Sequence, residues 1–89
     1  MQPARFDLPE RVTLGEASGV CRNALAALRA AAPQGPWLIE GGALRQFDSS
    51  CLALLLELRR SCTELRLHAL PERLLKLARA YGVETQIDG

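Results

Sequence analysis

The chain has 89 residues, which suits one small domain and leaves little room for a deep catalytic cleft. Hydrophobic residues make up 48% of it, which excludes intrinsic disorder, and 17 Leu and 13 Ala against 4 aromatic residues favour helices. With 11 basic and 10 acidic residues the formal net charge is +1, which argues against a nucleic-acid-binding module, because such modules carry a clear basic excess.

The first third of the chain predicts two short strands and a helix. Polar and apolar residues alternate over residues 5–8 and 11–13, on either side of Pro9, as they do in short strands. Thr13 and Glu16 have the spacing of a capping box, in which the Glu16 carboxylate reaches back to the Thr13 N–H. The following helix is expected from about Gly15 to Ala32, where prolines end it. Its predicted apolar face holds Ala17, Cys21, Ala24, Leu25, Leu28, Ala31 and Ala32.

The middle of the chain predicts a buried strand followed by a second helix. Residues 37–39 are a continuous apolar run between a proline and two glycines, which is typical of a strand buried on both faces. Either Asp48 or Ser49 can cap the next helix, which extends to Arg60. Residues 51–56 make this helix apolar nearly all the way round, so we expect it to pack on more than one side.

The last third predicts a strand, a helix and another strand. Residues 65–69 alternate as in a half-buried strand, and Pro71 suits the first position of a helix that Gly82 ends. Val83 to Ile87 are expected to form a last short strand. Strands that alternate with helices indicate an α/β fold, with a mixed, mostly parallel sheet of about four to five strands and about three helices packed on one face.

The cysteine and histidine content gives no sign of a metal site or a disulfide framework. Cys21, Cys51 and Cys62 are far apart in the sequence, and His68 is the only histidine. We therefore expect buried thiols in a reducing cytosol, with no bound metal or cofactor. The sequence lacks a secretory signal pattern, and its longest apolar run falls far short of the ~20 residues that span a bilayer. The expected protein is soluble and cytoplasmic.

The turn formed by Asp48, Ser49 and Ser50 carries the functional information. It delivers the chain to a helix N-terminus, where free N–H groups and a partial positive charge favour anions. A hydroxyl there is exposed, and its phosphorylation would add ~1.5–2 negative charges at one point of the surface. Helix capping by these residues is the simpler interpretation, and the spacing alone leaves both interpretations open.

Two stretches of the sequence resemble the STAS domain, the fold of anti-sigma-factor antagonists. Residues 48–50 and the leucine-rich residues 52–56 are similar to the family's D-[ST]-x-G-L signature, with Cys51 in place of its glycine. Residues 70–83 resemble the third helix of the short single-domain members. The MlaB-type subunit of the Mla phospholipid ABC transporter is the most similar type, because its helix also ends in the phrase LA-x-x-Y-x-[VL]. The resemblance implies one STAS-like domain over residues 1–89.

This resemblance implies a non-enzymatic adaptor or regulatory subunit that acts by binding another protein. In sigma-pathway members a kinase phosphorylates the hydroxyl residue after the Asp, and in the Mla member the same position contacts the transporter ATPase; by motif matching it is Ser49 here. The favoured expectation is an adaptor on such an ATPase, active in phospholipid transport and outer-membrane lipid asymmetry, and peripheral at the inner membrane through its partner. Expected partner-binding residues are Asp48, Ser49, Ser50, Arg73, Lys76 and Ala80.

Two alternatives stay open beside this expectation. In the first, the chain is an anti-sigma-factor antagonist in a partner-switching pathway, regulated by phosphorylation of Ser49; Cys51 in place of glycine favours docking over such a switch. In the second, Cys51 is an enzymatic nucleophile, since a helix N-terminus favours a thiolate. The sequence shows no nucleophile elbow and assigns no orienting carboxylate to His68, so we expect no catalysis. Basic residues of the second half are interleaved with glutamates, which predicts a solvated surface and no direct membrane insertion.

Overall fold

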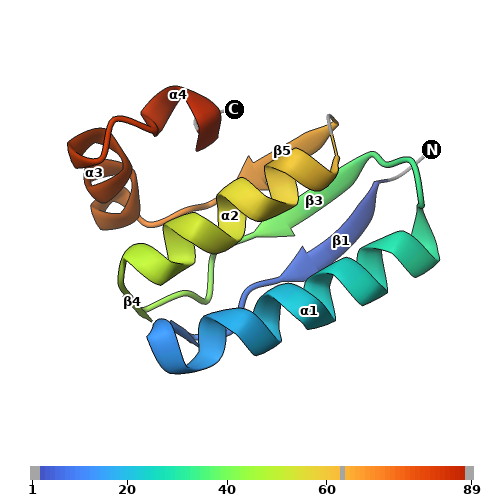
Figure 1. Cartoon of the computed structure of the whole chain (residues 1–89), viewed down its shortest axis with the longest axis horizontal. Coiled ribbons are helices and arrows are strands. Elements are labelled where there is room, and N and C mark those ends of the chain that lie inside the picture. Colours follow the sequence, from blue (N-terminus) through green and yellow to red (C-terminus); the bar gives the residue numbers. More distant parts are fainter. Residues whose placement is uncertain (1–2, 63, 88–89) are drawn as a thin grey trace.

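The computed structural model describes residues 3–62 and 64–87, and Figure 1 shows the path of the chain. Its elements, in chain order, are the strands β1 (Ala4–Asp7) and β2 (Arg11–Val12), the helix α1 (Leu14–Ala31), the strands β3 (Trp37–Glu40) and β4 (Gln46–Phe47), the helix α2 (Ser49–Ser61), the strand β5 (Leu65–His68), and the helices α3 (Glu72–Ala80) and α4 (Glu84–Ile87). The strand pairs among these elements are parallel. The α/β class predicted from the sequence is therefore confirmed.

The strands form two sheets. The larger has the order β1-β3-β5, with Ile39 between Phe6 and Leu67 in register. The smaller pairs β2 with β4 and places Val12 beside Phe47. Both short strands predicted around Pro9 are present, but they lie in different sheets. The prediction has no counterpart for β4, because two residues are too few to show a periodic pattern.

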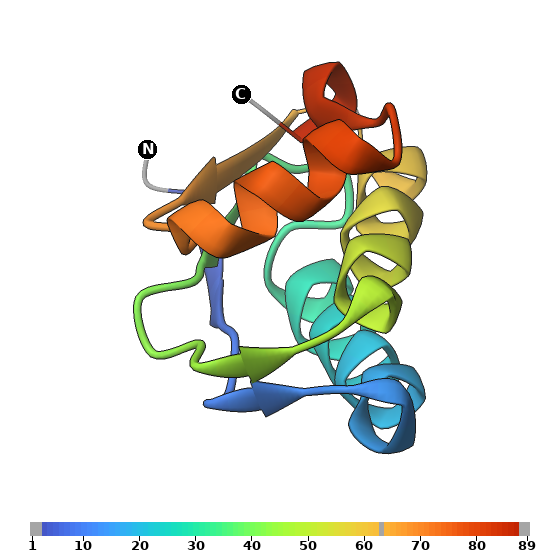
Figure 2. The same cartoon turned by 90° about the vertical axis from the view of Figure 1, so that its left-hand side faces the viewer.

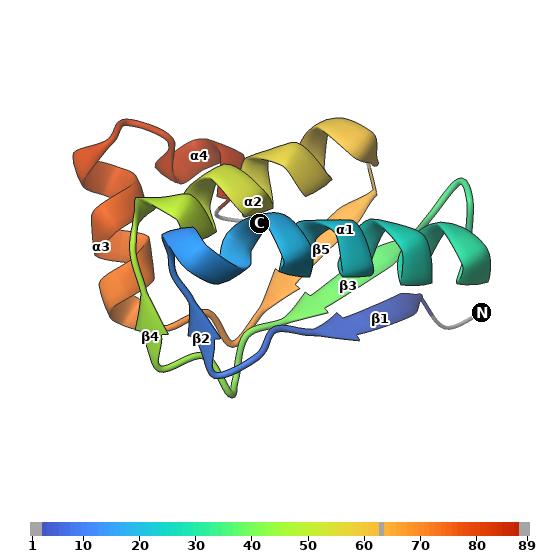
Figure 3. The same cartoon turned by 60° about the horizontal axis from the view of Figure 1, so that its bottom comes forward.

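Two helices cover one face of the larger sheet. Figure 2 shows this sheet at the left, with α1 and α2 to its right. In both Figure 1 and Figure 3, α3 lies beyond the carboxyl ends of β3 and β5. Along β3, Trp37 and Ile39 are buried while Leu38 and Glu40 are half-buried. The prediction that this strand is buried on both faces is wrong, because none of the described helices covers its second face.

The core lies between the larger sheet and the helices α1 and α2. Trp37 is the largest fully buried side chain, and its indole N–H donates a hydrogen bond of 2.7 Å to the Ala32 carbonyl oxygen. The helix α2 packs against α1, α3 and α4, which confirms that it is covered on more than one side. Its buried residues are Cys51, Leu52, Leu54, Leu55 and Leu58. On α1, Ala31 was expected on the apolar face but is exposed, because the helix ends there.

The C-terminal segment departs from the prediction. Pro71 is the N-cap of α3 and not its first helical residue, while Gly82, with a φ of +73°, follows the helix as expected. Val83 to Ile87 do not form a strand, since Glu84–Ile87 is the short helix α4. One helical turn placed against α2 and α3 buries Ile87 without needing a free strand edge as a partner.

Candidate functional site

The side chain of Asp48 joins the N-termini of two helices. Asp48 is the N-cap of α2, and its Oδ1 accepts a hydrogen bond of 2.8 Å from the Ser50 N–H. Its Oδ2 accepts a second hydrogen bond, of 3.1 Å, from the N–H of Leu14, the first residue of α1. One carboxylate therefore satisfies a free N–H at the start of each helix, so that the turn and α1 are held together across 34 positions of sequence.

These contacts favour the ionised form of Asp48. The hydrogen bond from the Ser50 N–H holds the pKa of Asp48 below its usual value of 3.8, and the Leu14 N–H acts in the same direction. On α1 the Glu16 carboxylate accepts from the Thr13 hydroxyl at 2.6 Å and from the Thr13 N–H at 2.9 Å, and these bonds lower the pKa of Glu16. The predicted reach of Glu16 back to Thr13 is confirmed. Negative charge thus stands at the positive ends of both helix dipoles.

The two serines of the turn differ in exposure. Ser49, the first residue of α2, is exposed, and the described part of the chain offers its hydroxyl no hydrogen-bond partner. Ser50 is half-buried and lines a groove between α1 and α2. Of the two hydroxyls, that of Ser49 is therefore the one presented to a partner or a modifying enzyme.

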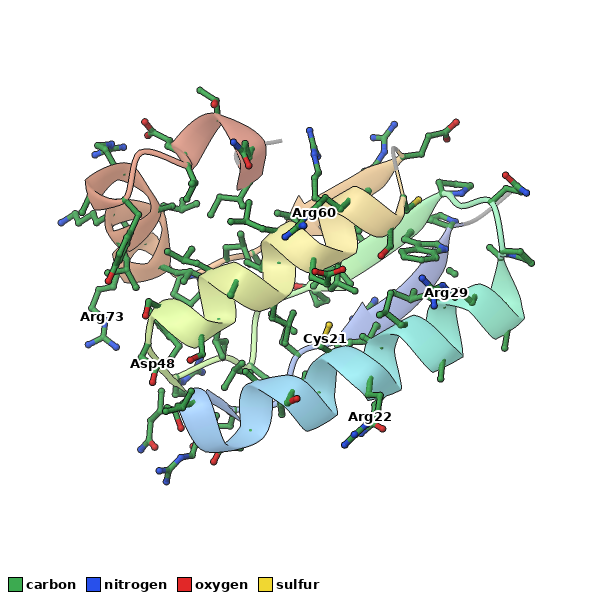
Figure 4. All side chains as sticks on the ribbon, in the orientation of Figure 1. Cys21, Arg22, Arg29, Asp48, Arg60 and Arg73 are labelled. Carbon is green, nitrogen blue, oxygen red and sulfur yellow. The ribbon has the colours of Figure 1, made fainter. Side chains whose placement is uncertain are left out.

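The helix α3 brings Arg73 next to the turn. The Arg73 guanidinium lies over the ring of Phe47, 5.3 Å from its centroid, and Phe47 immediately precedes Asp48. Figure 4 shows Arg73 and Asp48 at the same end of the molecule. Lys76 is exposed one turn further along α3, and Ala80 is exposed at its last position, ~10 Å from Arg73 along the helix axis. The structure therefore brings Arg73 next to the turn, places Lys76 one helical turn further along α3 and leaves Ala80 at the far end of that helix.

Sequence reasoning missed the contribution of α1 to this surface. Leu14 is 79% exposed although it is apolar, and its backbone N–H donates the hydrogen bond to the Asp48 carboxylate described above. It forms part of the groove between α1 and α2, which has a volume of about 460 Å³. The groove is lined by Leu14, Ala17, Ser18, Cys21, Arg22, Leu25, Ser50, Ala53, Leu54 and Glu57. The signal for Leu14 was present in the sequence, since it lies three residues before Ala17 and seven before Cys21 and so continues the same apolar face of the helix.

The geometry contradicts a nucleophilic role for Cys51. Its side chain is fully buried, and burial raises the pKa of Cys51 to about 12, so the helix N-terminus does not produce a thiolate there. His68 does have a carboxylate partner, which the sequence analysis did not assign: its Nδ1 lies 2.7 Å from Oε2 of Glu40. This pair, however, is on the open face of the sheet, away from α2 and Cys51. The two groups cannot act together.

Two other kinds of site are not found in the described residues. They contain no group of three or more His, Cys, Asp or Glu side chains arranged to hold a metal ion. Among the helices described, none combines the length and the apolar character needed to cross a membrane. Cys51 and Cys62 are buried and Cys21 is half-buried, and all three are free thiols.

Comparison with protein families gives one result for this chain. The family model described as "Mlab, STAS domain" matches residues 3–88, which is nearly the whole sequence. Neither curated proteins nor solved structures give a significant match. The match covers both the Asp48 turn and the α3 surface.

Proposed function

The chain belongs to the STAS domain family, of MlaB type, and on that premise we propose that it is a non-enzymatic adaptor on the ATPase of an Mla-type phospholipid ABC transporter. STAS domains are generally regulatory or adaptor domains that act through protein–protein contacts. The observation that carries the proposal is the exposed Ser49 hydroxyl. It lies at the first position of α2, the helix whose N-terminus Asp48 caps.

The surface around Ser49 has the composition of a protein contact. Leu14 supplies an exposed apolar side chain on one side of the turn, and the small residues of the α1–α2 groove continue from it. Arg73 and Lys76 add positive charge on the other side. Because Asp48 ties α1 to α2, this surface is ordered before any partner arrives, which lowers the entropic cost of binding. In this role the protein would act in the cytoplasm, at the inner membrane through its partner, and would support outer-membrane lipid asymmetry.

Co-purification with the ATPase of an Mla-type transporter tests this proposal. We expect a stable complex with the wild-type chain and a loss of affinity of at least about tenfold for Ser49→Arg, because a bulky cation at the centre of the contact prevents close packing. Ala27→Arg is the matched control, since Ala27 is exposed in the second half of α1 and the same side chain is introduced there. A Ser49→Arg variant that binds as tightly as Ala27→Arg rules out the proposed surface.

The accessibility of the same hydroxyl supports a second candidate, an anti-sigma-factor antagonist regulated by phosphorylation of Ser49. A phosphate there would stand beside the Asp48 carboxylate and would change the local charge by ~1.5–2 units. Incubation with an anti-sigma-factor serine kinase and ATP, followed by mass spectrometry, tests this candidate. Phosphate on Ser49 that is absent from Ser49→Ala supports it, and an unmodified wild-type chain counts against it.

A further inference from the structure

A separate pocket of about 440 Å³ lies at the carboxyl ends of β3 and β5, and we call it the carboxyl-end pocket. It is lined by Gly41, Gly42, Leu44, Arg45, Phe47, Ala69, Pro71 and Arg73. In open parallel α/β sheets, ligands bind outside the carboxyl ends of the strands, so this is the end of the sheet at which a ligand is expected.

Two guanidinium groups are held in place at this pocket. Arg73 stacks on Phe47 and donates to the carbonyl oxygen of Arg45 at 3.3 Å. Arg45 donates to the carbonyl oxygens of Gly42 and Leu44, at 3.0 and 3.3 Å. A guanidinium has five N–H donors, so each group keeps donors free for an added acceptor. Both are therefore positioned before a ligand arrives.

The charge of this cluster is not balanced within the described chain. Across residues 3–62 and 64–87, no carboxylate lies within ion-pair distance of Arg45, Arg73 or Lys76. Some other exposed arginines do have such partners, as Arg5 does with Asp7 at 2.7 Å, while Arg22, Arg29 and Arg66 have none within the described residues. The pocket thus offers two fixed guanidinium groups to an anion from outside.

The backbone at the rim of the pocket is strained and tightly packed. Ala69 has a φ of +58°, a conformation that costs a residue with a Cβ atom ~1–2 kcal/mol and that recurs at functional sites. Beside it, a Cβ atom on Gly41 would lie 3.3 Å from the Leu70 Cα and 3.4 Å from the Ala69 carbonyl oxygen. Glycine at position 41 lets the ends of β3 and β5 approach, which places Arg45 and Arg73 on one rim.

We infer that the carboxyl-end pocket binds a carboxylate-bearing segment of a protein partner. The inference rests on the proposed adaptor function for the existence of that partner, and it adds the chemistry by which the partner is recognised. Arginine pairs bidentately with carboxylates, and the apolar rim from Leu44, Phe47 and Pro71 suits a peptide rather than a free ion. Anionic membranes are recognised by clusters of 4–8 Lys or Arg, which is more than this surface offers.

The test is an NMR titration of the labelled protein at low salt with a hexaglutamate peptide. The backbone amide signals of Gly42, Arg45 and Arg73 are expected to shift. Affinity is expected to fall about three- to tenfold for Arg73→Gln, and also on raising the salt concentration. The control is Arg29→Gln, which removes the same charge at the opposite end of the molecule, where Figure 4 labels Arg29. This control is expected to bind like the wild-type protein.

Three results with the isolated protein, and one with its partner, would overturn the inference. The first is a shift pattern away from the pocket, or an equal loss for Arg73→Gln and Arg29→Gln. The second is binding of inorganic phosphate without binding of the peptide. The third is Arg73-dependent binding to phosphatidylserine vesicles with no response to the peptide. An ATPase complex that Arg73→Gln leaves at wild-type affinity overturns this inference and leaves the adaptor function intact, whereas the absence of any wild-type complex contradicts the adaptor function alone.

Discussion

Replacing Ala69 with glycine should stabilise the protein. Within the described chain, Ala69 is the one non-glycine residue with positive φ, at +58°, and the left-handed conformation costs an L-residue ~1–2 kcal/mol. Its methyl group is exposed, so its removal forfeits little burial. Glycine, however, loses more backbone entropy on folding than alanine does, and this cost offsets ~0.5–1 kcal/mol of the relieved strain. The net expectation is a free energy of unfolding higher by about 0.5–1 kcal/mol.

The matched variant Ala27→Gly is expected to change the free energy of unfolding in the opposite direction. Ala27 is also exposed, but it lies inside α1, where glycine costs ~1 kcal/mol relative to alanine. Urea unfolding followed by circular dichroism should therefore separate the two variants by roughly 1.5–2 kcal/mol, with the wild-type protein between them. If Ala69→Gly proves as destabilising as Ala27→Gly, the backbone at Ala69 is not strained and the reasoning is refuted.

Three further predictions concern the core, the turn and the buried thiol. Trp37→Ala should lower the free energy of unfolding by ~3–5 kcal/mol in urea titrations, because it empties a fully buried site and removes the indole hydrogen bond to the Ala32 carbonyl oxygen. Since the folded-state pKa of Asp48 is depressed, its contribution to stability is present above about pH 3.8 and is lost as the pH falls through the lower folded value. Asp48→Asn should therefore flatten that part of the stability–pH curve, and a curve unchanged by the substitution contradicts the assignment. Cys51, whose pKa burial raises to about 12, should react with thiol reagents far more slowly than the half-buried Cys21 in the native protein; mass spectrometry of the tagged peptides checks this, and equal rates would show that Cys51 is accessible.

Local signals in the sequence were sufficient for the features that depend on a few neighbouring residues. Thr13 with Glu16, and Asp48 before a leucine-rich run, mark helix starts because the hydrogen bonds that cap a helix come from residues two or three positions away. Both starts were predicted within one residue. The placement of Ser49 at the exposed head of α2 follows from the same local chemistry.

Features that depend on distant partners could not be predicted. Residues 37–39 are apolar whether one face or both faces of β3 are covered. Only the arrangement of the helices determines whether the second face is covered. Residues 83–87 are too few to distinguish a strand from a helical turn, and the burial of Ile87 against α2 and α3 decides in favour of the turn.

In the candidate site, too, the contacts between neighbouring residues could be predicted and the contacts between distant residues could not. Asp48 could be recognised as a cap, but its second hydrogen bond joins it to Leu14 at the start of another helix. The stacking of Arg73 on Phe47 likewise joins residues 26 positions apart, so that Arg45 and the carboxyl-end pocket were not apparent before the fold was known. Spacing in the sequence identifies the chemistry of a turn, whereas tertiary packing identifies its neighbours.

Site-directed photocrosslinking tests the adaptor role most directly. A photoreactive amino acid is introduced at Ser49 in one variant and at Ala27 in another, and each variant is mixed with the ATPase of an Mla-type transporter. Both positions are exposed on helices, so a random encounter would label them alike. The proposed function predicts an efficient crosslink to the ATPase from position 49 and little from position 27. A crosslink from position 27 alone, or none from position 49 in a complex that still forms, would contradict it.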